Sequence, residues 1–119
     1  MLLAAQIVTG IVALIHVYIV LLETVLFDTR GKRVFGLTDA AAAIVKPAMS
    51  NQGCYNGFLV AALALGLFWP DRAIAQAFAV FGLACVAVAG LFGAATASRK
   101  ILFIQTVPAV LVMLAVILA

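Results

Sequence analysis

Charged residues divide this chain into four long stretches of apolar side chains. The stretches cover residues 1–22, 47–70, 73–98 and 101–119. A helix needs about 20 apolar residues to cross roughly 30 Å of hydrocarbon, and the stretches do not alternate apolar and polar residues as membrane strands do. Helices satisfy their own backbone hydrogen bonds in lipid. The pattern therefore predicts an all-α, polytopic membrane four-helix bundle, with helices at about 2–27, 47–69, 73–98 and 101–118.

The composition agrees with a single transmembrane domain over residues 1–119. Hydrophobic residues make up 68% of the chain and charged residues 9%, and the mean hydropathy is +1.33. Soluble domains contain about 25% charged residues, so the composition excludes a soluble globular domain and a nucleic-acid-binding protein. The first stretch has no basic segment before it and is longer than the apolar core of a signal peptide. We therefore expect it to remain as the first membrane helix.

Basic residues predict the orientation of these helices. The predicted loop at about 28–46 and the turn at 99–100 lie on the same side of such a bundle and carry six basic residues, whereas the turn at 70–72 carries one. Loops rich in basic residues stay in the cytoplasm, so both termini are expected outside. The net charge of +3 fits contact with anionic lipid headgroups. These features predict a multi-pass protein of the bacterial inner (cytoplasmic) membrane.

The predicted cytoplasmic loop has room for a short helix of its own. Thr38 and Asp39 are residue types that favour a helix N-cap, which predicts a helix over residues 40–45. Lys46 precedes Pro47, and a residue before proline disfavours the α conformation. We expect the short helix to end there and Pro47 to lie in the first turn of the second membrane helix.

Small residues recur at helical spacing in the second and third predicted helices. The residues concerned are Gly53, Gly57 and Ala61, and the pairs Gly90/Ala94 and Gly93/Ala97. Small residues let helix backbones approach closely in lipid, either within one chain or between subunits. We expect a homo-oligomer, with a trimer favoured over other assemblies.

Polar residues form a stripe on the first predicted helix. Thr9, His16 and Glu23 are seven residues apart, and seven residues are close to two full helical turns. An ionisable residue inside a membrane span suggests a function. Two alternatives stay open, because Glu23 is close enough to the helix end to lie at the interface or pair two helices, and His16 could be a packed neutral residue.

A second group of polar residues opens the second predicted helix. Asn51 and Tyr55 share one face, and Gln52 and Asn56 share another, because each pair is four residues apart. With Glu23 and with Gln105 of the fourth helix, they lie near the cytoplasmic ends of their helices. This layer predicts either a pocket for a small molecule or a structural hydrogen-bond network. The candidate ligand-binding residues are His16, Glu23, Asn51, Gln52, Tyr55, Asn56 and Gln105.

Burial in lipid makes definite demands on these side chains. An unsatisfied polar group costs several kcal/mol there. We therefore expect Asn51, Tyr55 and Gln105 to face the protein interior, and Glu23 to bond the second or the fourth helix with His16 one layer deeper.

Motifs for common enzyme chemistry are absent from the sequence. It contains no HExxH, P-loop or Rossmann glycine pattern. One histidine and two dispersed cysteines cannot build a standard zinc site, so no metal site is expected. The catalytic residues, the cofactor and the question of enzyme activity stay open.

The stretch from Asn51 to Leu59, together with Gln105-Thr106-Val107-Pro108-Ala109, resembles a family of short bacterial four-helix membrane proteins with an NQG-x-YN signature. That family is described only as a domain of unknown function, and the resemblance covers essentially the whole chain. It implies the fold and no activity.

The layout is also similar, more distantly, to the MAPEG proteins (membrane-associated proteins in eicosanoid and glutathione metabolism). Their second helix begins with an Arg-Ala-x-x-Asn-x-x-Glu pattern. Ala48 and Asn51 match it, whereas Pro47 and Cys54 replace the arginine and the glutamate. The likeness implies a MAPEG-like bundle and a trimer, and leaves the use of glutathione open.

Three functions are compatible with these observations. The first is binding of a lipophilic or amphiphilic small molecule in a polar pocket at the cytoplasmic side of the bundle. The second is a small proton-coupled exporter that uses Glu23 and resembles the small multidrug resistance proteins in length and helix number. The third is a non-catalytic membrane partner subunit.

Overall fold

The computed structural model describes residues 1–119 and is entirely helical. Its elements are α1 (Leu3–Glu23), the π-helical turn η1 (Phe27–Gly31), α2 (Lys32–Val34), α3 (Asp39–Phe68), α4 (Arg72–Thr96), the π-helical turn η2 (Leu102–Thr106) and α5 (Val107–Leu118). Two helices, α1 and α4, are long and apolar enough to cross a membrane. The apolar helix at Leu102–Leu118 is shorter. The remaining long helix, α3, is not one of the two, and it carries Asn51, Gln52, Tyr55 and Asn56.

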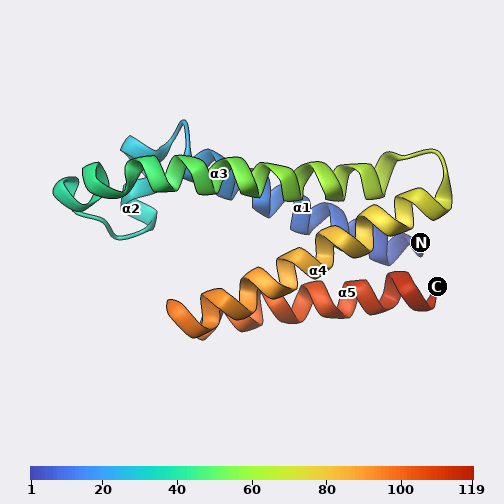
Figure 1. Ribbon diagram of the computed structural model, residues 1–119. Coiled ribbons are helices and arrows are strands. Elements are labelled where there is room, and N and C mark those ends of the chain that lie inside the picture. Colours follow the sequence, from blue (N-terminus) through green and yellow to red (C-terminus); the bar gives the residue numbers. More distant parts are fainter.

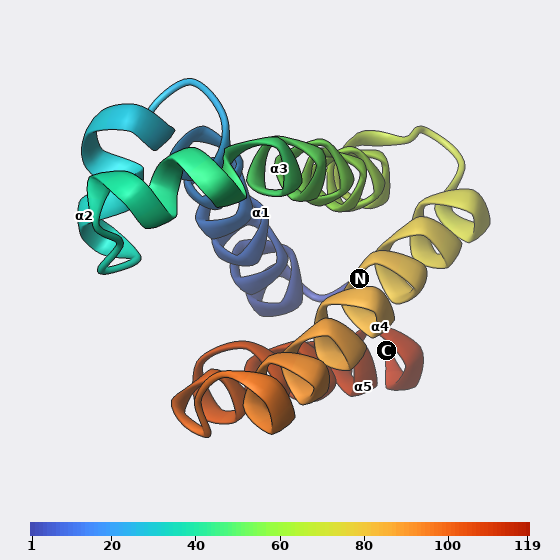
Figure 2. The ribbon, with the colours of Figure 1, turned by 60° about the vertical axis from the view of Figure 1, so that its left-hand side comes forward.

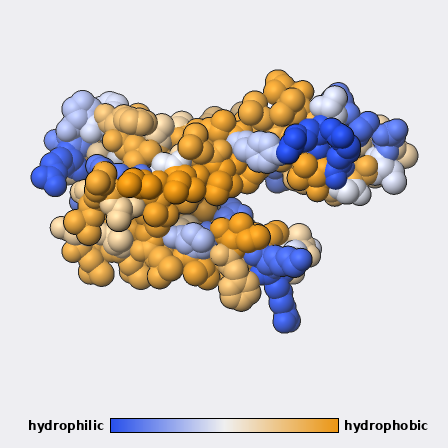
Figure 3. Space-filling model, turned by 180° about the vertical axis from the view of Figure 1, so that it is seen from behind, coloured by the Kyte–Doolittle hydropathy of each residue, from blue (hydrophilic) through white to orange (hydrophobic).

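The helices form two antiparallel pairs. Helix α1 lies along α3, and α4 lies along α5 (Figure 1). The turn between α3 and α4 joins the pairs at the end of the molecule where both chain termini lie (Figure 1). The pairs separate toward the other end, where the α1–α3 and α4–α5 connections lie (Figures 2 and 3). Polar connections thus occupy the two ends, with a largely apolar surface between them (Figure 3).

The core lies where the two pairs meet. Its fully enclosed side chains include Leu63 of α3, Ala79 and Leu83 of α4, and Ala109 of α5. Only 23 of the 119 residues are buried, and many large apolar side chains remain on the outside. A water-soluble protein does not usually expose so much contiguous apolar surface, so this surface suits an apolar solvent.

Helix α3 differs from the sequence-based prediction at its start. The predicted N-cap is confirmed, because the Thr38 hydroxyl accepts a hydrogen bond from the Ala41 backbone N–H at 3.1 Å. The predicted break at Lys46-Pro47 is wrong, because α3 runs through Pro47 as one helix of 30 residues. Proline removes one backbone donor and disfavours the α conformation before it, so tertiary contacts must offset that cost.

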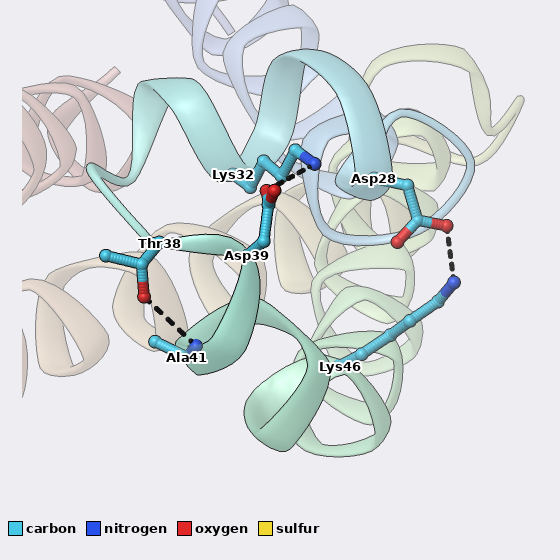
Figure 4. Close-up of polar contacts among 6 residues, drawn as sticks. All are labelled: Asp28, Lys32, Thr38, Asp39, Ala41 and Lys46. Atoms are coloured by element: carbon cyan, nitrogen blue, oxygen red, sulfur yellow. Dashed lines mark hydrogen bonds and ion pairs between the residues drawn. The ribbon is translucent and has the colours of Figure 1, made fainter.

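Two ion pairs hold this first part of α3 against the preceding segment (Figure 4). Lys32 pairs with Asp39 at 2.8 Å, and Lys46 pairs with Asp28. The hydrogen bond and the positive charge of Lys32 lower the pKa of Asp39 below its usual value. These contacts give residues 39–46 partners outside their own helix, which a local sequence pattern does not reveal.

Glycines lie at the closest approaches between helices. A Cβ atom on Gly66 of α3 would lie 2.8 Å from the backbone of Ala79 in α4, and Gly90 of α4 packs directly against Thr106 of η2. Gly57 has no atom within 4 Å of such a position. The small residues therefore serve packing within the chain at Gly66 and Gly90, whereas Gly57 faces outward.

Candidate functional site

Glu23 is the centre of a polar contact between α1 and α3. Glu23 is only 3% exposed. One carboxylate oxygen accepts a hydrogen bond from the Gln52 amide at 3.0 Å, and the other accepts one from the Asn56 amide at 2.8 Å. The expectation that Glu23 bonds the second long helix is confirmed. The helix-pairing alternative describes this contact.

Local sequence explains how α3 comes so close to Glu23. Gln52 and Asn56 are one helical turn apart and present their amides on one face. Gly53 lies between them and is buried. A Cβ atom there would lie 2.6 Å from Thr24 Cγ2 and 3.2 Å from Glu23 Cβ. The missing side chain at Gly53 therefore lets the two amides reach the carboxylate.

His16 lies on the same face of α1, two turns further into the molecule. Thr9, His16 and Glu23 are all buried, so the predicted polar stripe on one face of this helix is confirmed. His16 Nδ1 is 2.8 Å from the Val12 carbonyl oxygen. Its other ring nitrogen, Nε2, has no hydrogen-bond partner, and neither does the Thr9 hydroxyl.

A small cavity adjoins the His16 ring. Its volume is about 60 Å³, and it lies between α1, α4 and η2. Gln105 is half-buried and lines this cavity together with His16. The expectation that Gln105 turns inward is therefore confirmed. The structure brings together the single histidine of the chain and an amide from the π-helical turn, which are far apart in the sequence.

The two other candidates of α3 lie elsewhere. Tyr55 is 61% exposed, and Asn51 is also exposed. The expectation that both face the interior is wrong for the single chain. The reason is the rotation of α3: when Gln52 and Asn56 face α1, residues 51 and 55 lie about 100° further round the helix. The four polar residues thus divide into one pair that bonds Glu23 and one outer pair without that contact.

Sequence reasoning missed a contact at the end of α1. The Arg30 guanidinium donates to the Tyr18 hydroxyl at 2.6 Å and lies 5.6 Å from the centre of its ring. The chain can fold back against the end of α1 because Gly31, which has no side chain, packs against the backbone of residues 22 and 26. The available signal was a tyrosine, Tyr18, in the first apolar stretch, followed by basic residues after its end, since aromatic rings attract guanidinium groups.

A larger cavity lies at the opposite end of the molecule. Its volume is about 470 Å³, and its polar lining includes Gln6, Arg72 and Gln76. Gln76 already donates to the Val116 carbonyl at 3.2 Å. This cavity contains none of the predicted site residues, and its signal in the sequence was limited to isolated glutamines in otherwise apolar stretches.

The residues of the site offer hydrogen bonds and one acidic group. No three histidine, cysteine, aspartate or glutamate side chains lie close enough together to hold a metal ion. Cys54 and Cys85 are free thiols. The arrangement can orient a polar head group or exchange a proton at Glu23, and it contains no histidine beside a hydroxyl or thiol nucleophile.

Comparisons with known proteins identify the family alone. Searches of curated proteins and of solved structures found no match. A family profile matches residues 10–117, which include Glu23, the polar start of α3 and Gln105. The chain therefore belongs to the family described as "Protein of unknown function (DUF1304)".

Proposed function

We propose that this protein is an integral membrane protein that binds a lipophilic or amphiphilic small molecule at the polar end of its helix bundle. The observation that carries the proposal is the buried Glu23 carboxylate, which is held between two helices by the Gln52 and Asn56 amides. An ionisable group placed inside an apolar bundle is costly and marks a functional site by default. The unpartnered His16 ring nitrogen on the same face adds a second polar group with unused capacity.

The shape of the molecule supports entry of such a ligand from the bilayer. The two helix pairs separate at the end that carries the polar layer (Figure 3). Large apolar side chains are exposed along the pairs, among them Ile15 and Ile104 beside the small cavity. An apolar tail could therefore lie among these side chains while a polar head reaches the layer.

The proposal includes four membrane crossings with both termini outside. The α1–α3 and α4–α5 connections lie at one end and the termini at the other (Figure 1). This arrangement puts six basic residues at one end, as counted from the sequence, and such an end stays in the cytoplasm. The proposed location is the bacterial inner membrane.

A reporter fused after Ala119 tests this orientation. In a bacterial host, alkaline phosphatase fused there should be active, because it requires the periplasm. Green fluorescent protein at the same position should be dark. A fusion within residues 35–37 should show the reverse pattern. Fluorescence of the fusion after Ala119 would contradict the proposed topology.

Assembly into a homo-oligomer is a further part of the proposal. Asn51 and Tyr55 lie on the outer face of α3, and polar groups exposed to hydrocarbon are costly. A second copy would cover them, and a trimer with a MAPEG-like layout is the favoured assembly. Contact with an unrelated membrane protein at the same face is the alternative, in which the chain is a partner subunit.

A proton-coupled exporter is the second candidate function. Glu23 is the only acidic residue within the four proposed spans, and exporters of this kind need one such group. Proton-driven efflux by protein reconstituted in vesicles would favour it over simple binding. Under both functions Glu23 meets the ligand.

Native mass spectrometry from a mild detergent tests the proposal, because one spectrum reports the subunit number and any small molecule that stays bound. The wild type should carry a non-covalent adduct. Glu23→Gln should keep the fold and the subunit number but lose the adduct, because the amide retains the shape and removes the acid. Asp28→Asn is the matched control and should keep the adduct, since Asp28 makes an exposed ion pair with Lys46. Equal adducts in the wild type and Glu23→Gln would contradict the role of Glu23.

A further inference from the structure

The cavity beside His16 has an unusual combination of polar groups and apolar walls. The His16 residue is 3% exposed, and its Nε2 atom has no partner. Gln105 lines the same cavity of about 60 Å³. The remaining lining consists of aliphatic side chains of α1, α4 and η2: Val12, Ile15, Ile19, Val86 and Ile104.

The hydrogen bond on the other side of the ring defines what Nε2 can do. The Val12 carbonyl can only accept, so Nδ1 must carry the hydrogen of the 2.8 Å contact. In the neutral ring, Nε2 is then a hydrogen-bond acceptor. A buried acceptor without a donor costs free energy. The site therefore requires a group that donates a hydrogen bond.

Gln105 is the second polar residue that lines the cavity. Its amide contains both donors and an acceptor, and a cavity of this size is only a few ångströms across. A hydroxyl group has one hydrogen to donate to an acceptor such as His16 Nε2 and lone pairs that can accept from an amide such as that of Gln105. A carboxylate has no proton to donate, and an ammonium group would find no charged partner among the cavity-lining residues.

The volume and the aliphatic lining of the cavity indicate which groups can be attached to the hydroxyl. A water molecule needs roughly 10–15 Å³ of such space, so the cavity exceeds the need of one water several-fold. Water would also meet mostly aliphatic walls. A hydroxyl with one or two attached methylene groups fills the space and matches those walls, and Ile104 is exposed beside the cavity, where a longer tail can leave.

We propose that the His16–Gln105 cavity binds the hydroxyl end of a lipophilic alcohol, with His16 Nε2 as acceptor and the Gln105 amide as donor. This inference rests on the proposed binding function and deepens it, since it names the class of ligand. Glu23 lies two helical turns away on the same face and takes no part in holding the hydroxyl.

The test uses the fact that His16 is the only histidine of the chain. Full-length protein with ¹⁵N-labelled histidine in lipid nanodiscs gives two ring nitrogen resonances, both from His16. The probes are 1-octanol and its methyl ether, which have similar chains but differ in the ability to donate. Octanol should shift the Nε2 resonance saturably and leave Nδ1 nearly unchanged. The ether should shift neither at the same membrane concentration.

Two variants separate the site from general effects of the alcohol on the bilayer. Gln105→Leu should raise the octanol concentration at half-saturation about fivefold, because one neutral hydrogen bond is lost. Gln6→Leu is the matched control, since Gln6 is on α1 but lines the cavity at the other end, and it should leave the titration unchanged. Equal shifts with octanol and the ether would overturn the inference. So would an Nε2 resonance that is hydrogen-bonded to water alone and does not respond to octanol.

The result is distinguishable from a failure of the proposed function. Suppose that mass spectrometry shows an adduct that is lost in Glu23→Gln, but octanol does not shift the Nε2 resonance. This result would overturn the hydroxyl site and leave the proposed function intact. A saturable octanol response without any adduct that depends on Glu23 would contradict the proposed role of Glu23 and uphold the His16 site.

Discussion

Gly66→Ala is expected to destabilise the folded chain by about 2 kcal/mol, in the range typical of overpacked interiors. The added Cβ atom would lie 2.8 Å from the backbone nitrogen, the Cα and the Cβ of Ala79. A side chain could rotate away from such a contact, but the backbone of α4 cannot. Helices α3 and α4 must therefore move apart, and this loosens the packing of Leu63 and Leu83, which are fully buried.

Gly57→Ala in the same helix is the matched control. It makes the same chemical change, but no atom lies within 4 Å of its new methyl group. Alanine also favours a helix by about 1 kcal/mol over glycine, so this variant should be as stable as the wild type or more stable. Unfolding in mixed micelles with increasing denaturing detergent, followed by circular dichroism, measures both. Equal stability of the two variants would contradict the proposed close approach.

Asn56→Leu is expected to cost about 1–3 kcal/mol of unfolding free energy, because the Glu23 carboxylate loses one of its two donors while it stays buried. In a Glu23→Leu background the same change should cost much less, since no carboxylate is left to satisfy. The difference is a coupling free energy of about 1–2 kcal/mol, as expected for residues in direct contact. The same unfolding titration on the four proteins of the cycle measures it.

Asn51→Leu provides the control for this cycle. Asn51 is the same residue type on the same helix, one residue before Gln52, but it is exposed and Glu23 has its two amide partners elsewhere. Its replacement should change the stability of the single chain by less than about 0.5 kcal/mol. If the coupling free energy between Asn51 and Glu23 were as large as that between Asn56 and Glu23, the described rotation of α3 about its axis would be contradicted.

Local periodicity was enough to predict the polar stripe of α1. The backbone geometry of a helix brings residues seven apart to one face, so Thr9, His16 and Glu23 share a face whatever surrounds them. The Thr38 cap was predictable for the same reason, because its hydroxyl reaches a backbone N–H three residues ahead. Both features depend on atoms that are close in the sequence.

Periodicity within α3 could not predict which of its two polar faces turns inward. The pairs Asn51/Tyr55 and Gln52/Asn56 have the same spacing, and both are polar. Which pair turns inward depends on the rotation of α3 about its own axis, and that rotation is set by contacts at Gly53 with Thr24 and at Gly66 with Ala79. These contacts join residues far apart in the chain, so spacing within α3 alone gives no preference.

The sequence by itself thus determined the helical class, the apolar character of the surface and the polar stripe of α1, because each follows from composition or from the repeat of a single helix. Only the tertiary structure decided that α3 continues through Pro47, that Gln52 and Asn56 rather than Asn51 and Tyr55 meet Glu23, and that Gln105 shares a cavity with His16. Each of these outcomes depends on how one helix packs against another. Such packing is the sum of many small contacts and close approaches between distant residues, and no local pattern encodes it.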